Sequence, residues 1–252
     1  AMELSTIARL FPGRMMAGIG HGVPAWTQQM GLYPASPLTS MREAVTAIRR
    51  LLEGETLTEE GDYFSFDEVV LTHPAEGLPL YCGVVGPKSL ELSGEIADGT
   101  VVSVVAAPRY LEFARAAIAR GAEVSGRDAD QHRLPTFALY NVDTDREKAR
   151  EAAKALLAFY LAAVGPTAMT GVYEVNDQLS DMISRGGPDV VAAEMPEEWL
   201  DTFAIAGEPD ECAEKITDLL GAGATSVVLA PVPPDNGREL IELTASSVLP
   251  LL

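Results

Sequence analysis

The residues with the clearest chemical potential lie where an apolar run meets the start of a helix. Residues 80–85 form that run, and Gly86, Pro87 and Lys88 follow it directly. Unpaired backbone N–H groups and the helix dipole attract an anion to such a strand-to-helix junction. Gly86 lets a ligand approach the backbone, Pro87 presets the first helical turn, and Lys88 adds a positive charge. The junction is typical of an anion site, although Gly-Pro also begins helices that bind nothing.

A second candidate is the glycine-rich loop GIGHG at residues 18–22, which follows an apolar run of its own. If both runs are parallel strands, the two loops lie at the same edge of the sheet. His21 is then the candidate catalytic residue, or else a structural hydrogen-bonding residue. Trp26 either stacks on a planar ring or fills the core.

Other recognisable catalytic patterns are absent from the sequence. It contains no G-x-S-x-G elbow, Walker loop, G-x-G-x-x-G helix start or H-E-x-x-H motif, and it predicts no metal site. Cys82 and Cys212 have no metal-binding companions at a useful spacing. His73 and His132 lie in polar turns, where we expect surface residues. An enzyme with these residues needs a cofactor that brings its own chemistry.

The elements that position the two loops alternate between strands and helices. Strands are predicted at residues 15–19, 80–85, 100–105, 136–142 and 225–231, with helices between them. This alternation predicts parallel strands joined by right-handed crossovers. Residues 55–71 depart from it as a β-hairpin, and residues 165–198 as an insertion. Five strand-helix units fit an open doubly wound sheet or part of an eight-stranded barrel.

Composition narrows the range of partners. The 252 residues include 37 acidic and 18 basic side chains, for a formal net charge of −19. This charge repels nucleic acid and anionic membranes, and otherwise serves solubility. No apolar run reaches about 18 residues, so no membrane span is expected. The two isolated cysteines fit a reducing cytoplasm. Residues 1–10 look like the end of a helix without a cap, which suggests an upstream segment.

Four segments, in this order, match a known family. FPGRMMAGIGHGVPAW, SPLTSMREAVTAIRRLLEGE, YCGVVGPKSLELSGEIADG and FAIAGEPDECAEKI resemble the luciferase-like monooxygenase superfamily, and within it the deazaflavin-dependent branch that includes methylenetetrahydromethanopterin reductases. The resemblance implies an α/β fold, a (β/α)₈ TIM barrel of the bacterial-luciferase type, as a single domain over residues 1–252. The five predicted strands would be strands four to eight of that barrel, with the N-terminal part absent.

The resemblance also implies a function. Members of this superfamily transfer a hydride between a cofactor and a small organic substrate, or activate oxygen when the cofactor is a flavin. Coenzyme F420 is the implied cofactor, FMN is the alternative, and a homodimer is the implied assembly. The implied cofactor contacts are Gly83, Val84, Val85, Gly86, Pro87 and Lys88 near the phosphate, and Gly20, His21 and Gly22 near the ring or its tail.

Two competing hypotheses remain open. In sugar-phosphate and alcohol dehydrogenases of the superfamily an acidic residue follows the loop glycine, whereas this chain has Val23. A catalytically silent relative that sequesters a flavin or deazaflavin is therefore one competing hypothesis. The other is a fragment that buries an open barrel edge by dimerising, or that aggregates through it.

Overall fold

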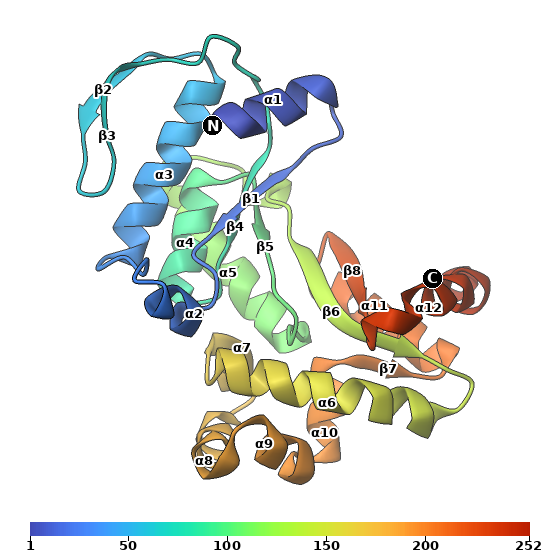
Figure 1. The fold of residues 1–252 in the computed structure, drawn as a ribbon. Coiled ribbons are helices and arrows are strands. Elements are labelled where there is room, and N and C mark those ends of the chain that lie inside the picture. Colours follow the sequence, from blue (N-terminus) through green and yellow to red (C-terminus); the bar gives the residue numbers. More distant parts are fainter. The chain divides into compact units, whose positions relative to one another are not determined.

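The computed structural model describes residues 1–252, which form two compact units (Figure 1). Unit 1 comprises Ala1–Val101 and Ala116–Arg133, and unit 2 comprises Val102–Arg115 and Leu134–Leu252. None of the helices combines the length and the apolar character that a membrane span requires. Strands alternate with helices along the chain, as the sequence predicts.

Unit 1 contains a parallel three-stranded sheet in the order β1-β4-β5. Its strands are β1 (Ala17–Gly20), β4 (Leu80–Gly83) and β5 (Gly99–Val101). The three predicted strands are confirmed, but β4 and β5 end earlier than predicted. In the register of β1 and β4, Ala17 lies opposite Leu80 and Gly20 opposite Gly83. The two strands therefore end side by side.

Helices cover one face of this sheet. Apolar side chains of α3 (Pro37–Leu52), among them Met41 and Val45, pack with Leu80 and Cys82 of β4 in a buried core. The other helical segments of this part are α1 (Met2–Leu10), α2 (Pro24–Gln29), α4 (Pro87–Ile96), the C-terminal part of α5 (Pro108–Ser125) and η1 (Ala129–Gln131). Burial of apolar area on this face is the main driving force for its folding.

The predicted hairpin is present and is held by one carboxylate. Strands β2 (Leu57–Glu60) and β3 (Ser65–Val69) pair antiparallel. The Glu43 carboxylate of α3 accepts hydrogen bonds from the backbone N–H groups of the turn at residues 62–64, at 2.9 to 3.0 Å. Because these bonds favour the charged form, they lower the pKa of Glu43.

Unit 2 contains a second parallel sheet in the order β7-β6-β8. Strand β6 (Pro135–Val142) pairs with β8 (Ser226–Pro231) along most of its length, and its end pairs with β7 (Ile205–Gly207). The sequence does not predict β7, because three residues carry no readable alternation. Helices α6 (Arg146–Val164), α11 (Pro209–Gly221) and α12 (Gly237–Leu243) accompany these strands.

The region predicted as an insertion of short helical pieces consists of four short helices. They are α7 (Ala168–Gly171), α8 (Asn176–Gly186), α9 (Pro188–Glu194) and α10 (Glu197–Phe203). The chain ends in short irregular helices, which are η2 (Pro234–Asn236), η3 (Thr244–Val248) and η4 (Leu249–Leu251).

Buried polar groups lie near the beginning of β5, and one of them is a histidine that the sequence predicts to be at the surface. His132 is 4% exposed, so the expectation of a surface residue is wrong. Its ring Nε2 lies 2.8 Å from Thr100 Oγ1, which in turn lies 2.7 Å from Ser93 Oγ. A polar ring can be buried when hydrogen-bond partners satisfy its nitrogen atoms. The partner Thr100 is 32 residues away in the sequence, so the polar residues around His132 do not reveal it.

Asp98 holds the beginning of β4 in place. Its carboxylate accepts a hydrogen bond from the Leu80 backbone N–H at 2.9 Å and pairs with the guanidinium groups of Arg49 at 2.9 Å and Arg127 at 2.5 Å. Burial by itself raises the pKa of Asp98, but these partners outweigh it and hold the pKa below its usual value. The charged carboxylate is thus part of the folded structure.

We expect Asp98→Asn to lower the free energy of unfolding by about 2 kcal/mol at pH 7, because two guanidinium groups lose their shared anion. Since the folded-state pKa is lowered, the wild-type advantage is complete above the usual aspartate pKa and disappears as the pH falls through the folded-state value. Urea unfolding between pH 7 and pH 3 measures this. Asp67→Asn is the control, because Asp67 is exposed on β3. Equal losses in both variants would contradict the prediction.

Candidate functional site

The two loops predicted to bind a cofactor leave neighbouring strands of unit 1. Gly20 at the end of β1 lies directly opposite Gly83 at the end of β4. The chain then continues as His21 and Gly22 on one side and as residues 84–88 on the other. All nine predicted site residues therefore extend from one edge of the β1-β4-β5 sheet. Their joint role in binding stays a prediction.

One face of this sheet is bare backbone near the strand ends. Gly18, Gly20 and Gly83 share the face, because strand residues two apart and residues directly opposite in parallel strands point the same way. All three are exposed. A Cβ atom at Gly20 would lie 3.0 Å from the carbonyl oxygen of Gly83, which is closer than Cβ atoms normally approach. Without side chains here, a planar ring can lie directly against the backbone.

The flanks of this glycine floor are apolar and partly aromatic. Tyr81 lies opposite Gly18 in the register, and its hydroxyl donates to the Met16 sulfur at 3.3 Å. Val101 Cγ2 lies 3.6 Å from where a Cβ of Gly18 would be. Gly18, Tyr81 and Val101 thus join the nine predicted residues as candidates for the site. The two-residue spacing of Gly18 and Gly20 was the available signal, but only strand pairing adds the other two.

The α4 N-terminus is the predicted anion site. Gly86 is the N-cap in an extended conformation, and its carbonyl accepts bonds from the Leu90 N–H and, at 2.9 Å, from the Ser89 hydroxyl. No side chain caps the first turn, whose N–H groups have no partner within the helix. Lys88 is exposed and makes no ion pair. An anion here would meet free donors and an unpaired cation.

His21 begins the other loop and is half-buried. Burial lowers its pKa, which favours the neutral imidazole with one donor and one acceptor nitrogen near pH 7. The next residue, Gly22, has φ +74°, a conformation that side chains rarely adopt, so glycine is required at this turn. His21 is thus held at the end of β1 by a tight turn.

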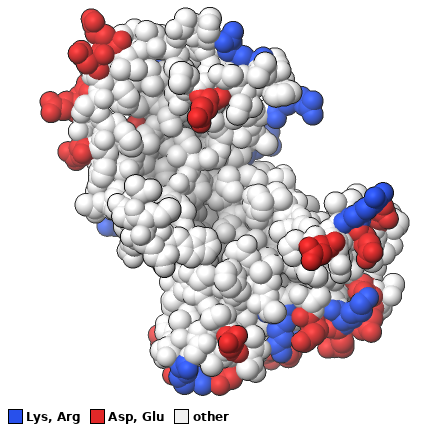
Figure 2. All heavy atoms as spheres, in the orientation of Figure 1, with Lys and Arg blue, Asp and Glu red and all other residues white.

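The short helix α2 follows this turn. Val23 is its N-cap. The valine side chain caps nothing, and the backbone carbonyl accepts hydrogen bonds from the N–H groups of Trp26 and Thr27. Trp26 is 47% exposed, so the core alternative is wrong for it. Figure 2 shows acidic side chains over the β2-β3 hairpin but few charged atoms over α2. The rim of the site on this side carries little charge.

Comparison with known proteins identifies a single family. The model of the family described as luciferase-like monooxygenase matches residues 1–226. A 5,10-methylenetetrahydromethanopterin reductase from Archaeoglobus fulgidus is 34% identical over 100% of this chain and 78% of its own length.

Two solved structures are similar over nearly the whole chain. The coenzyme F420 dependent tetrahydromethanopterin reductase from Methanopyrus kandleri has a TM-score of 0.81 at 30% identity, covering 99% of this chain and 78% of its own. An F420-dependent secondary alcohol dehydrogenase in complex with an F420-acetone adduct has a TM-score of 0.75 at 25% identity, covering 97% and 72%. Both names include the same deazaflavin coenzyme.

We expect His21 to titrate with a midpoint below 6.5, the usual value for histidine, because burial disfavours the imidazolium ion. Proton NMR of the ring C–H signals measures this, and the chain has only three histidines. The His21→Gln variant assigns the signal by removing it. A midpoint at or above 6.5 would contradict the burial that the structure shows.

Proposed function

Because the chain belongs to the luciferase-like monooxygenase family, we propose that it is a coenzyme F420-dependent oxidoreductase that transfers a hydride between the deazaflavin and a small organic substrate. The predicted family and its α/β fold are confirmed. The predicted F420-dependent branch is confirmed by relatives with that activity, which also favour F420 over FMN. The observation that most supports the proposed site is the pairing of Gly20 with Gly83, because it brings the N-terminus of α4 close to a strand face without side chains.

The residues present fit this cofactor. The floor of Gly18, Gly20 and Gly83 accepts the flat face of a ring, and a side chain there would block it. Gly86 and Lys88 would hold the phosphate of the cofactor side chain through first-turn N–H groups and the ammonium. When bound, coenzyme F420 supplies the hydride chemistry.

The chain's own groups would bind, orient and exclude water. The neutral His21 ring would donate or accept one hydrogen bond at the ring or at a substrate oxygen. The rim with Trp26 would keep water from the ring. No carboxylate is available at Val23, so His21 is the group proposed to orient the substrate or hold a proton. The substrate is a small molecule, and the similar enzymes are named for methylenetetrahydromethanopterin, glucose-6-phosphate and a secondary alcohol.

Val23 also supports a second candidate function, a catalytically silent deazaflavin-binding protein. Such a protein needs the glycine floor and the anion site but no proton donor. The two candidates agree on cofactor binding and differ in turnover, so reduction of a substrate by bound, reduced cofactor separates them.

We also propose the finer architecture. The five parallel strands that the sequence predicts, β1, β4, β5, β6 and β8, would correspond to strands four to eight of a (β/α)₈ barrel, with residues 1–252 as one domain and the helices at 165–198 as an insertion. A homodimer and a cytoplasmic location are further proposals. The location is supported by Cys82 and Cys212, which are both buried and unbridged.

We expect Lys88→Glu to weaken coenzyme F420 binding about 10- to 100-fold, because an attractive contact with the phosphate becomes a repulsive one. Fluorescence titration of the deazaflavin with purified protein measures this, with FMN as the comparison ligand. Arg9→Glu is the control, because it makes the same charge change at an exposed position of α1. No binding of either cofactor by the wild type at micromolar concentration would refute the proposed function, and unchanged affinity in Lys88→Glu would remove the anion site.

We expect Gly83→Val to abolish binding of the ring while the fold persists. The Cβ position at Gly83 is open, with its nearest atoms 3.8 Å away, and valine suits a strand. The isopropyl group would cover the floor and lower affinity for coenzyme F420 at least tenfold. Circular dichroism and thermal unfolding verify the fold. Wild-type affinity in a folded variant would place the ring elsewhere.

A further inference from the structure

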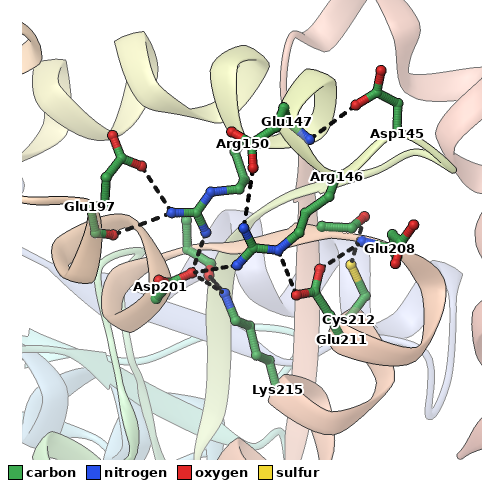
Figure 3. Close-up of polar contacts among 12 residues, drawn as sticks. Asp145, Arg146, Glu147, Arg150, Glu197, Asp201, Glu208, Glu211, Cys212 and Lys215 are labelled. Atoms are coloured by element: carbon green, nitrogen blue, oxygen red, sulfur yellow. Dashed lines mark hydrogen bonds and ion pairs between the residues drawn. The ribbon is translucent and has the colours of Figure 1, made fainter.

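Unit 2 contains a cluster of charged side chains that joins three helices (Figure 3). Arg150 of α6 has a side chain that is only 5% exposed, and it pairs with Glu197 and Asp201 of α10. Asp201 is also approached by Arg146 at 3.8 Å and by Lys215 of α11 at 3.6 Å. One carboxylate is therefore shared by three cations.

A cavity of about 210 Å³ lies beside this cluster, within unit 2. Most of its wall is apolar and belongs to buried side chains, among them Ala138, Phe203, Ile205 and Leu219. Its polar lining residues are Lys215, Asp201, Asp218, Thr202 and Tyr173. None of the residues predicted for the cofactor lines it. The cavity thus combines an apolar wall with one ammonium group and two carboxylates, one of which, Asp201, is paired with Arg150.

Lys215, whose side chain is 24% exposed, has donors left for a further partner. Its ammonium carries three N–H donors, but within hydrogen-bond distance it reaches only the carbonyl oxygen of Ala204, at 3.2 Å. Asp201 stands farther away and is already paired with Arg150. Burial lowers the pKa of Lys215, and the Arg150 charge acts in the same direction. An added anionic acceptor would satisfy donors that the chain leaves open.

The same surroundings restrict the ligand. Glu211, which pairs with Arg146, and the lining residue Asp218 add negative charge nearby, so a polyanion such as a diphosphate would be repelled. The cavity volume of about 210 Å³ suits a small organic molecule. A singly charged acid with a compact apolar body fits both limits.

We propose that this cavity is a binding site for a small organic monocarboxylate, whose carboxylate pairs with Lys215 while its apolar body fills the space between β6, β7 and α11. The occupant would also contact Phe203 at the end of α10. It would therefore link α10 to α11 and stabilise unit 2.

Binding of para-fluorobenzoate, followed by fluorine NMR, tests the proposal. We expect saturable binding to the wild-type protein and at least tenfold weaker binding of the uncharged para-fluorobenzamide, which has nearly the same shape. Lys215→Met should also weaken binding of the acid at least tenfold, because it removes the cation and keeps much of the apolar stem. Lys154→Met is the matched control, since Lys154 pairs with Glu197 in the same cluster but does not line the cavity.

A second measurement does not depend on the stability of any variant. The chain has only four lysines, so isotope-labelled methyl groups on the lysine amines give few NMR signals. The Lys215 signal of the wild-type protein should move on titration with para-fluorobenzoate, while those of Lys148 and Lys154 stay in place. Equal binding of acid and amide, unchanged affinity in Lys215→Met, an unmoved Lys215 signal or no binding at all would overturn the proposal.

Discussion

The in-register pairing of β1 with β4 is the constraint on which the candidate site depends. It sets Gly20 opposite Gly83, and from these two residues the loop with His21 and the junction with Lys88 begin. A shift of the register by one residue would turn Gly83 to the other face and break the continuous glycine floor. The backbone of two strands, more than any single side chain, brings the proposed anion site beside a surface on which a ring can lie.

The opposite end of the same strand has a structural role. Asp98 binds the backbone N–H of Leu80 and two guanidinium groups, so the beginning of β4 is held by charge-assisted hydrogen bonds. In parallel α/β folds chemistry gathers at the carboxyl ends of the strands and stabilising contacts at their amino ends. Strand β4 shows this division. Asp98 holds its amino end at Leu80, and the candidate site begins at its carboxyl end, at Gly83.

In a chain with a formal net charge of −19, acidic side chains are available to pair with most of the basic ones. Most basic side chains pair with carboxylates, as Arg150 does with Glu197 and Asp201. Lys88 at the α4 N-terminus makes no ion pair, and Lys215 beside the unit 2 cavity lies 3.6 Å from the Asp201 carboxylate, beyond hydrogen-bond distance. In an acidic protein, a cation without a full set of partners marks a place where an external anion is favoured. Both proposals of ligand binding rest on that physical reason.

The sequence by itself determined the alternation of strands and helices, the hairpin, and the two loops with their chemical character. These follow from local periodicity and from the backbone properties of residues such as Gly86 and Pro87, which need no knowledge of distant contacts. The tertiary structure alone decided that Gly20 meets Gly83, that β7 exists as a three-residue strand, that His132 is buried, and that Lys215 faces a cavity. Each of these depends on which distant segments become neighbours, because partner atoms far away in the chain satisfy or leave open the hydrogen bonds and charges.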